Sequence, residues 1–303
     1  MTYVWAERFN DAPRLIELGG DTVCVQIRGT GPTVVLEAAG SGQGVGGSWG
    51  PVVEDRLAEV AMVVTYDRPG VGRSSGTPRH TITKMADDLH ELIRAIEVQL
   101  PAIVVSWSYG GLVSAVHAMR HPEDVSGLVF VDPTPTAPPP TPRALRVPLQ
   151  AVAIAQLRVM AWASARRFFE TRTGTRMSAQ LAGPRATSEM IEQSTRFYRT
   201  PQAIHDLAAT LSHMDSHLIE VAGILGEPGV RFPNVPTTVI SAGRRPARMP
   251  DAHRAHVDGS HNLLAALAPR GRVVVAEHVS HQIPYEHPEI IVRHTIESMN
   301  GAP

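Results

Sequence analysis

The chain has 303 residues, with 28 basic and 29 acidic side chains, and its formal net charge is −1. This length allows one large α/β domain with an insertion, or about two domains. A hydrophobic share of 43% is sufficient for a buried core and argues against disorder. The near-zero charge excludes a general electrostatic attraction to nucleic acid. One cysteine, Cys24, excludes an internal disulfide and a cysteine-rich zinc site.

Targeting and membrane signals are absent from the sequence pattern. Residues 1–8 lack the basic segment and apolar run of a signal peptide. No uncharged apolar stretch reaches the about 18 residues that a spanning helix needs. We therefore expect a cytoplasmic protein without stable membrane insertion, and the sequence leaves its oligomeric state open.

Short apolar runs alternate with longer amphipathic ones, which is typical of a mostly parallel sheet with helices on both faces. A turn at residues 29–32 separates the first two predicted strands. The predicted strands are 22–28, 33–37, 61–66, 102–105, 127–131, 237–241 and 272–276. The predicted helices are 51–60, 84–98, 112–120, 255–267 and 288–299.

The pattern changes after the strand that ends at Val131. Six prolines lie between Pro133 and Pro142, and they exclude a regular helix or a central strand there. Residues 143 to about 223 are predicted to form several helices with no intervening strand. We interpret this region as an inserted helical cap, so that residues 1–133 and 224–303 form the core and residues 134–223 form the cap.

Two serines compete as a nucleophile. Ser48 lies in a literal Gly-x-Ser-x-Gly match, but a glycine loop precedes it and Pro51 follows it, so the strand that the motif requires is missing. Ser108 has a strand before it and a helix after it. Its neighbours Ser106 and Gly110 are small, as a sharp strand-to-helix turn requires. The alternative interpretation of Ser108 is an ordinary capping serine.

A serine hydroxyl needs a base to take its proton. Among the 14 histidines, His281 stands on a loop after the last predicted strand, at the edge of the sheet where catalytic groups gather. His278 is the rival, although it lies closer to the strand. We expect His287 to cap the final helix.

These features together resemble the alpha/beta-hydrolase superfamily over most of residues 20–300. The residues that carry the resemblance are the glycine-rich loop that starts at Gly40, the segment 67–74, the turn at Ser108 and the segment 280–288. The resemblance implies a mostly parallel eight-stranded sheet flanked by helices, with an inserted helical cap. It also implies the chain order nucleophile, acid, histidine, and no cofactor.

The resemblance assigns an oxyanion hole to two backbone N–H groups, which leaves the side chains there free to vary. We assign the donors to Tyr109, next after the nucleophile, and to Gly40. Ala39 or Ser41 could replace Gly40 if the assignment is one residue off. Trp107 flanks the nucleophile and could shape a substrate pocket or pack beneath the sheet.

The sequence offers several candidates for the acid. The family often places it after the seventh strand, but residues 241–248 contain no carboxylate and Arg245 stands about where it should be. Asp132, at the end of the sixth strand, is our preferred acid, with Asp251 and Asp258 as alternatives. The competing interpretation is that Asp132 only caps the proline turn.

Residues 147–169 are apolar and interrupted by arginines. Three interpretations stay open: a helix packed on the core with its arginines reaching water, a lid that lines a hydrophobic substrate pocket, or a basic amphipathic helix at a membrane surface. His253 and His256 lack the neighbours that a metal site needs, so no metal is expected.

The leading hypothesis is a serine hydrolase that cleaves a small hydrophobic ester, thioester or lactone. A carbon–carbon bond hydrolase, a perhydrolase or an acyltransferase would use the same residues. Ser108 disfavours the related enzymes that use an aspartate nucleophile.

Two other classes compete. Residues 42–47 match Gly-x-Gly-x-x-Gly, and Asp67 ends the next strand as a ribose-binding acid would, so a dinucleotide-binding oxidoreductase is possible. That hypothesis leaves Ser108 and His281 unexplained. A non-catalytic binding protein on a hydrolase scaffold would account for the missing acid near Arg245.

Overall fold

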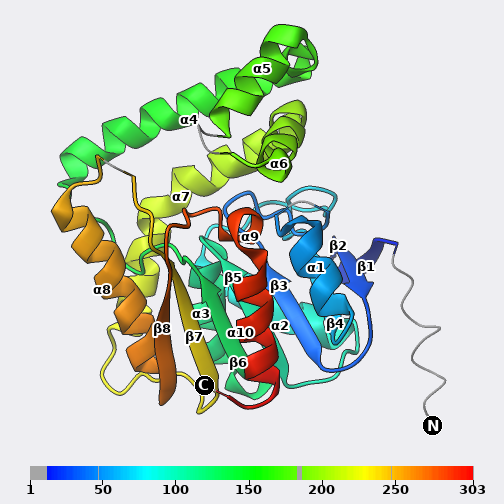
Figure 1. The fold of residues 1–303 in the computed structure, drawn as a ribbon, viewed down its shortest axis with the longest axis vertical. Coiled ribbons are helices and arrows are strands. Elements are labelled where there is room, and N and C mark those ends of the chain that lie inside the picture. The colour runs from blue at the N-terminus through cyan, green and yellow to red at the C-terminus, as the bar shows by residue number, and fades with distance from the viewer. Residues whose placement is uncertain (1–11, 47, 183–185, 247, 303) are drawn as a thin grey trace.

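The computed structural model describes residues 12–46, 48–182, 186–246 and 248–302. Residues 1–8, on which the expectation of no signal peptide depends, lie outside the described residues, as does Gly47 of the glycine-rich loop. An eight-stranded sheet forms the centre of the molecule, and helices cover both of its faces (Figure 1). The predicted α/β fold class is confirmed.

The sheet has the strand order β1-β2-β4-β3-β5-β6-β7-β8. Strands β3 to β8 run parallel, whereas β2 pairs antiparallel with β4 and β1 pairs antiparallel with β2. The central strands are continuous apolar runs because both of their faces are covered. The strands are β1 Arg14–Leu18, β2 Asp21–Arg28, β3 Thr33–Glu37, β4 Met62–Tyr66, β5 Ala102–Trp107, β6 Val125–Val131, β7 Pro236–Ala242 and β8 Arg270–Ala276.

Helices α1 and α10 cover one face of the sheet, and α2, α3 and α8 cover the other (Figure 1). Each contributes its apolar side chains to the cluster beneath it, as Leu57 of α1 and Leu112 of α3 do. The helices are α1 Gly50–Ala58, α2 Ile82–Ala95, α3 Gly110–Arg120, η1 Pro122–Asp124, α4 Arg143–Ala165, η2 Phe168–Glu170, α5 Arg172–Leu181, α6 Ser188–Arg199, α7 Pro201–Leu225, α8 Asp251–Leu267, α9 Ile283–Glu286 and α10 Pro288–Met299.

The turn at residues 29–32 does not join neighbouring strands, because β4 lies between β2 and β3. Gly29 has a positive φ of 72° and passes close to the end of α1. A Cβ atom at Gly29 would lie 2.3 Å from the carbonyl oxygens of Ala58 and Ala61. Only glycine fits here, so the role of Gly29 is to let the chain pass close to the backbone at the end of α1.

Between β6 and β7 the described residues form the helices α4, η2, α5, α6 and α7 and no strand. We call residues 143–225 the helical insertion. It lies over the carboxyl ends of the central strands, and α4 runs along the outside of α7 (Figure 1). The carboxyl-terminal part of α7 packs into the core through Leu218, Val221 and Leu225. The boundary expected at residue 223 therefore falls in the last turn of a helix that is already part of the core.

Candidate active site

Ser108 occupies the turn between β5 and α3, and its φ of 55° places a non-glycine residue in the left-handed region. The turn is held by three backbone bonds of Ser108: its N–H donates to Val131, and its carbonyl accepts from Gly111 and Thr134. Such strain persists only where the surrounding structure fixes it, and it concentrates at functional sites. A Cβ atom at Gly110 would lie 2.6 Å from the carbonyl oxygen of Ala38, which explains the small residue there.

Three side chains that are distant in the sequence form a chain of hydrogen bonds at this turn. The Oγ of Ser108 lies 3.0 Å from Nε2 of His281. The Nδ1 of the same ring lies 2.7 Å from Oδ2 of Asp132. The side chain of His281 is 47% exposed and that of Asp132 is 5% exposed, so the carboxylate is buried behind an accessible imidazole.

Asp132 is held as an anion by its surroundings. Its Oδ1 accepts hydrogen bonds from the N–H of Ala242 at 2.9 Å and from the guanidinium of Arg245 at 2.8 Å. Burial raises the pKa of Asp132, but the hydrogen bond and charge of His281, the charge of Arg245 and the Ala242 N–H together hold that pKa well below its usual range. A carboxylate here accepts a hydrogen bond from Nδ1–H of the imidazole and so leaves Nε2 free to accept a proton from Ser108.

Arg245 stands where the sequence resemblance leads one to expect a carboxylate. Its guanidinium is nearly buried and also donates to Ser241 Oγ at 2.9 Å. Asp258 lies 3.5 Å from Arg245 on the exposed side. Within the described part of the chain, neither Asp258 nor Asp251 contacts His281. The residue that replaces the expected acid is therefore a partner of Asp132.

We expect the Arg245→Gln variant to lose about tenfold in kcat with little change in KM, because it loses a charge that stabilises the anion of Asp132. Arg245→Lys should recover part of the loss, because it retains the charge but not the planar fork. The check is steady-state kinetics on a chromogenic ester, with matched circular dichroism spectra. An unchanged kcat in Arg245→Gln would show that this ion pair does not support His281.

Gly40 and Tyr109, the predicted oxyanion donors, line the same pocket of about 430 Å³ as Ser108 and His281. Neither backbone amide donates a hydrogen bond to another of the described residues. The rivals Ala39 and Ser41 line this pocket too, and Ala39 accepts from Gly42 at 3.0 Å in a tight turn. The amides of Gly40 and Tyr109 are thus available to a bound oxyanion.

A buried arginine supports this loop, although the sequence analysis gave it no role. Arg68 donates to Glu37 at 2.7 Å, to the carbonyl of Ala39 at 3.2 Å and to the carbonyl of Ala38. Its guanidinium also lies over the ring of Tyr109, 5.1 Å from the centroid. Burial lowers the pKa of Arg68, but the charge and hydrogen bond of Glu37, together with the tyrosines Tyr66 and Tyr109, outweigh burial and raise that pKa. The ion pair therefore fixes the backbone just before Gly40.

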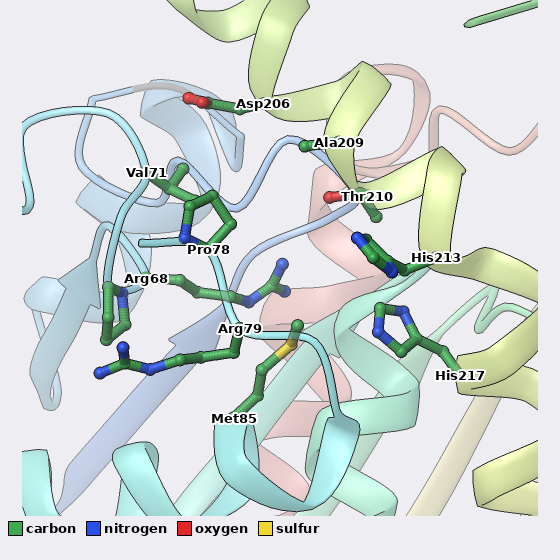
Figure 2. Close-up of a pocket in the computed structure, with 11 residues that line it drawn as sticks. Arg68, Val71, Pro78, Arg79, Met85, Asp206, Ala209, Thr210, His213 and His217 are labelled. Carbon is green, nitrogen blue, oxygen red and sulfur yellow. The ribbon is translucent and has the colours of Figure 1, made fainter. Parts of the chain in front are cut away.

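Beside this ion pair lies a small pocket of about 30 Å³, between the segment after β4 and helix α7. Figure 2 shows Arg68 and Met85 facing His213 and His217 across it. The hydroxyl of Tyr109 lies 2.8 Å from Nδ1 of His217. This contact links the residue next to Ser108 to the helical insertion.

Asp67, which the dinucleotide hypothesis takes as the ribose-binding acid, is buried, and both of its carboxylate oxygens accept backbone hydrogen bonds. Its carboxylate accepts from the N–H of Val45 and the N–H of Arg73, both at 3.0 Å. In the glycine-rich loop, a Cβ at Gly44 would lie 2.2 Å from the carbonyl oxygen of Tyr66. The loop and the aspartate therefore pack against each other. Close packing, rather than a bound dinucleotide, explains the glycines and the acid that match the dinucleotide pattern.

Ser48 has a different setting from Ser108. It is buried, and its Oγ donates to the carbonyl of Gln43 at 2.6 Å. It follows the end of β3 by eleven residues, so it does not sit on a strand-to-helix turn. Although Ser48 lines the pocket, no histidine of the described chain contacts its hydroxyl.

The rival histidines and Trp107 also have defined places. His278 and His287 do not contact Ser108 within the described residues, and His287 precedes α10 without a capping hydrogen bond from its side chain. Trp107 lines the pocket and donates from its indole to the carbonyl of His281 at 3.0 Å. It therefore positions the loop that carries His281, a contact that the sequence pattern did not indicate.

The outer wall of the pocket comes from the helical insertion. Its side chains are mostly apolar, and they face Ser108 and His281 from α5, α6 and α7. These residues are Leu181, Ala182, Met190, Phe197, Tyr198, Leu207, Leu211 and Met214.

One group of side chains outside the pocket could hold a metal ion by distance alone. The ligand atoms of His90, His121, Glu123 and Asp124 lie within 4.8 Å of one another. Asp124, however, is paired with Arg94 at 2.8 Å and with His90 at 2.6 Å. Since a guanidinium already neutralises the buried carboxylate, we assign this cluster a structural role.

The sequence profile of the Alpha/beta hydrolase family matches residues 34–294. This match covers most of the chain, and the fold and the site geometry agree with it: the chain belongs to the alpha/beta hydrolase family. This family consists of hydrolytic enzymes built on such a sheet. The resemblance in the sequence had predicted this class.

Individual relatives match over shorter stretches. The chain is 38% identical over 111 residues to a pimeloyl-[acyl-carrier protein] methyl ester esterase of Chromobacterium violaceum, which is 37% of this chain and 41% of the esterase. It is 36% identical over 118 residues to the putative carbamate hydrolase RutD of Serratia proteamaculans, 38% of this chain and 43% of that protein. The chain thus spans about two-fifths of the length of these relatives.

Solved structures match over nearly the whole length. The epoxide hydrolase CorEH superposes with a TM-score of 0.66 at 17% identity, covering 95% of this chain and 98% of that chain. A likeness at this identity shows the shared fold and leaves the reaction to be argued from the side chains.

Proposed function

We propose that this protein is a serine hydrolase that cleaves a small hydrophobic ester, thioester or lactone through an acyl-enzyme on Ser108. The observation that carries the proposal is the hydrogen-bond chain from Ser108 through His281 to Asp132, at an accessible pocket. In this proposal His281 is the general base and acid, and Asp132 orients and stabilises its imidazolium.

The proposed reaction proceeds in two halves. The Oγ of Ser108 attacks the substrate carbonyl carbon while Nε2 of His281 takes its proton, and the carbonyl oxygen becomes an oxyanion. The amides of Gly40 and Tyr109 bind that oxyanion. As the tetrahedral intermediate collapses, the bond to the leaving group breaks, and His281 gives its proton to the departing oxygen or sulfur.

In the second half, water attacks the acyl carbon and gives its proton to His281. The bond between the acyl group and Ser108 then breaks, His281 returns the proton to the serine, and a carboxylic acid leaves. Asp132 remains ionised throughout, which agrees with the lowered pKa of its carboxyl group.

The apolar wall supplied by α5, α6 and α7 supports a hydrophobic acyl or ring group in the substrate. In this proposal the helical insertion acts as the cap that sets specificity. The names of the two relatives state methyl ester cleavage and carbamate hydrolysis, which both break a bond at a carbonyl carbon, and this supports the same class. A hydroxyl at residue 108 also argues against nucleophilic attack by a carboxylate at this turn.

The competing classes lose the observations on which they depended. The non-catalytic hypothesis used the missing acid near Arg245, and Asp132 now lies against His281 with Arg245 as its partner. The dinucleotide hypothesis used Asp67, whose carboxylate is buried in backbone contacts. We favour hydrolysis over both.

The proposal is tested by labelling the purified protein with a fluorophosphonate and mapping the modified peptide by mass spectrometry. We expect one label on Ser108, and none in Ser108→Ala or His281→Ala, because the reagent requires an activated serine. A label on Ser48 would contradict our choice of nucleophile. A folded protein that neither takes the label nor hydrolyses a small ester would contradict the hydrolase assignment itself.

A further inference from the structure

Helix α4 presents an apolar stripe to solvent. Leu149 is 68% exposed, Val159 65% and Trp162 58%, and such side chains have meaning where they gather in one patch. The spacing of the members is three, four or seven residues, so they lie along one side of the helix. The α4 stripe consists of Leu145, Leu149, Val152, Val159 and Trp162.

The opposite side of α4 is packed on the protein. Arg146 pairs with Asp215 of α7 at 2.6 Å, and Gln150 donates to the carbonyl of Leu211. Ala161 and Ser164 are buried on this side. Figure 1 shows α7 between α4 and the sheet, with α4 on the outer side of α7. One side of α4 is therefore fixed, and the stripe faces away from the molecule.

Charge is segregated along this part of the chain. Residues 143–187 contain eight arginines and a single carboxylate, Glu170, although the net charge of the whole chain is only −1. Arg143 and Arg158 are exposed, and neither has an ion-pair partner among the described residues. The guanidinium of Arg166 lies over Trp162, 3.8 Å from the ring centroid. The stripe is thus flanked by cations and has an aromatic ring near one end.

We propose that the α4 stripe is a docking surface for anionic lipid, so that the helical insertion lies flat on a bilayer surface. An exposed apolar stripe, flanking arginines and an interfacial tryptophan are the features that hold a helix in the headgroup region. A cytoplasmic setting, which we also propose, would bring this face to an anionic leaflet. Helix α4 packs on α7, and α7 contributes to the wall of the pocket, so docking would hold this part of the helical insertion at the membrane surface.

By length and composition alone, α4 could cross a membrane. The contacts with α7 and the exposed Arg158 near its centre favour a helix that lies on the surface instead. This orientation agrees with the expectation of no stable insertion.

A second copy of the chain is a less suitable occupant. The stripe from Leu145 to Trp162 is about 26 Å long and one helix wide. A stable dimer buries roughly 800 Å² on each partner, more than one such stripe provides. Two copies would also bring their arginines together. Charge complementarity therefore favours anionic lipid.

The test is co-sedimentation with vesicles of phosphatidylcholine containing one-third phosphatidylglycerol, compared with vesicles of phosphatidylcholine alone. We expect at least tenfold stronger partitioning to the anionic vesicles, weakened by added salt. Val159→Glu should reduce this partitioning at least tenfold, and Arg158→Gln about fivefold. The matched control is Val60→Glu, the same substitution at an exposed valine between α1 and β4, which should bind as the native protein does.

A spectroscopic readout is independent of these variants. Trp49 and Trp107 are buried, so Trp162 is the exposed tryptophan of the described chain. Its emission should move to shorter wavelength with anionic vesicles, and Trp162→Phe should abolish that change. Equal partitioning to both vesicle types, or to neither, would overturn the proposal. A dimer in light scattering that Val159→Glu converts to a monomer would overturn it as well. None of these readouts requires hydrolysis, so they stand apart from the test of the proposed function.

Discussion

Replacing Ser108 by alanine is expected to reduce ester hydrolysis by at least about four orders of magnitude in kcat, with KM changed little. The side chain of Ser108 supplies the attacking oxygen, and no other hydroxyl of the described chain meets His281. Backbone donors and substrate binding survive the change, so a small residual rate over water should remain. Steady-state kinetics on a panel of chromogenic esters and lactones measures the loss.

The control is Ser48→Ala, at the pocket serine that carries the literal Gly-x-Ser-x-Gly match. Ser48 loses only a hydrogen bond to Gln43, so this variant should stay within about tenfold of the native rate. If Ser48→Ala were inactive and Ser108→Ala active, the assignment of the nucleophile would be wrong. A rate in Ser108→Ala close to that of the native protein would remove the acyl-enzyme from the proposal.

The sequence predicted the parallel core because its strands carry the strongest pattern. Buried β3 was predicted with its observed bounds, Thr33–Glu37, since continuous apolar residues between turn signals have few other interpretations. The edge strand β1 was not among the strands that the sequence located. Leu15 in β1 is 59% exposed, so the run Arg14–Leu18 lacks a clear buried face and gave no such signal.

The nucleophile turn was predictable because its constraints are local. The strand, the small neighbours and the helix all lie within a few residues of Ser108. The pairing of Asp132 with Arg245 depends on β6 and β7 being neighbours, and residue spacing does not reveal that contact. For the same reason the support of the Gly40 loop by Arg68 and Glu37 could not be predicted from the sequence.

The helical insertion shows a third limit. Periodicity indicated helices in this region, but the side of α4 that faces the protein is decided by α7, about sixty residues later in the chain. The sequence therefore left three interpretations of residues 147–169 open. The exposed stripe excludes the first of them, a helix whose apolar face is packed on the core.

The Asp132→Asn variant is expected to lose at least about two orders of magnitude in kcat while substrate binding barely changes. An amide cannot stabilise the imidazolium of His281, and it can hold the ring in the wrong tautomer. In the native protein the pKa of Asp132 is lowered, so the carboxylate stays ionised at every pH suited to a hydrolase assay. The loss should therefore extend across the neutral and alkaline range, and kcat measured against pH will test this.

Two further variants separate Asp132 from its rivals. Asp251→Asn and Asp258→Asn should retain nearly full kcat, because neither side chain contacts His281 in the described chain. Of the two, Asp258→Asn should have the larger effect, since Asp258 lies 3.5 Å from Arg245 and acts on Asp132 only through that guanidinium. A native rate for Asp132→Asn, with a large loss for Asp258→Asn, would transfer the role of the acid from Asp132, just after β6, to Asp258 in α8.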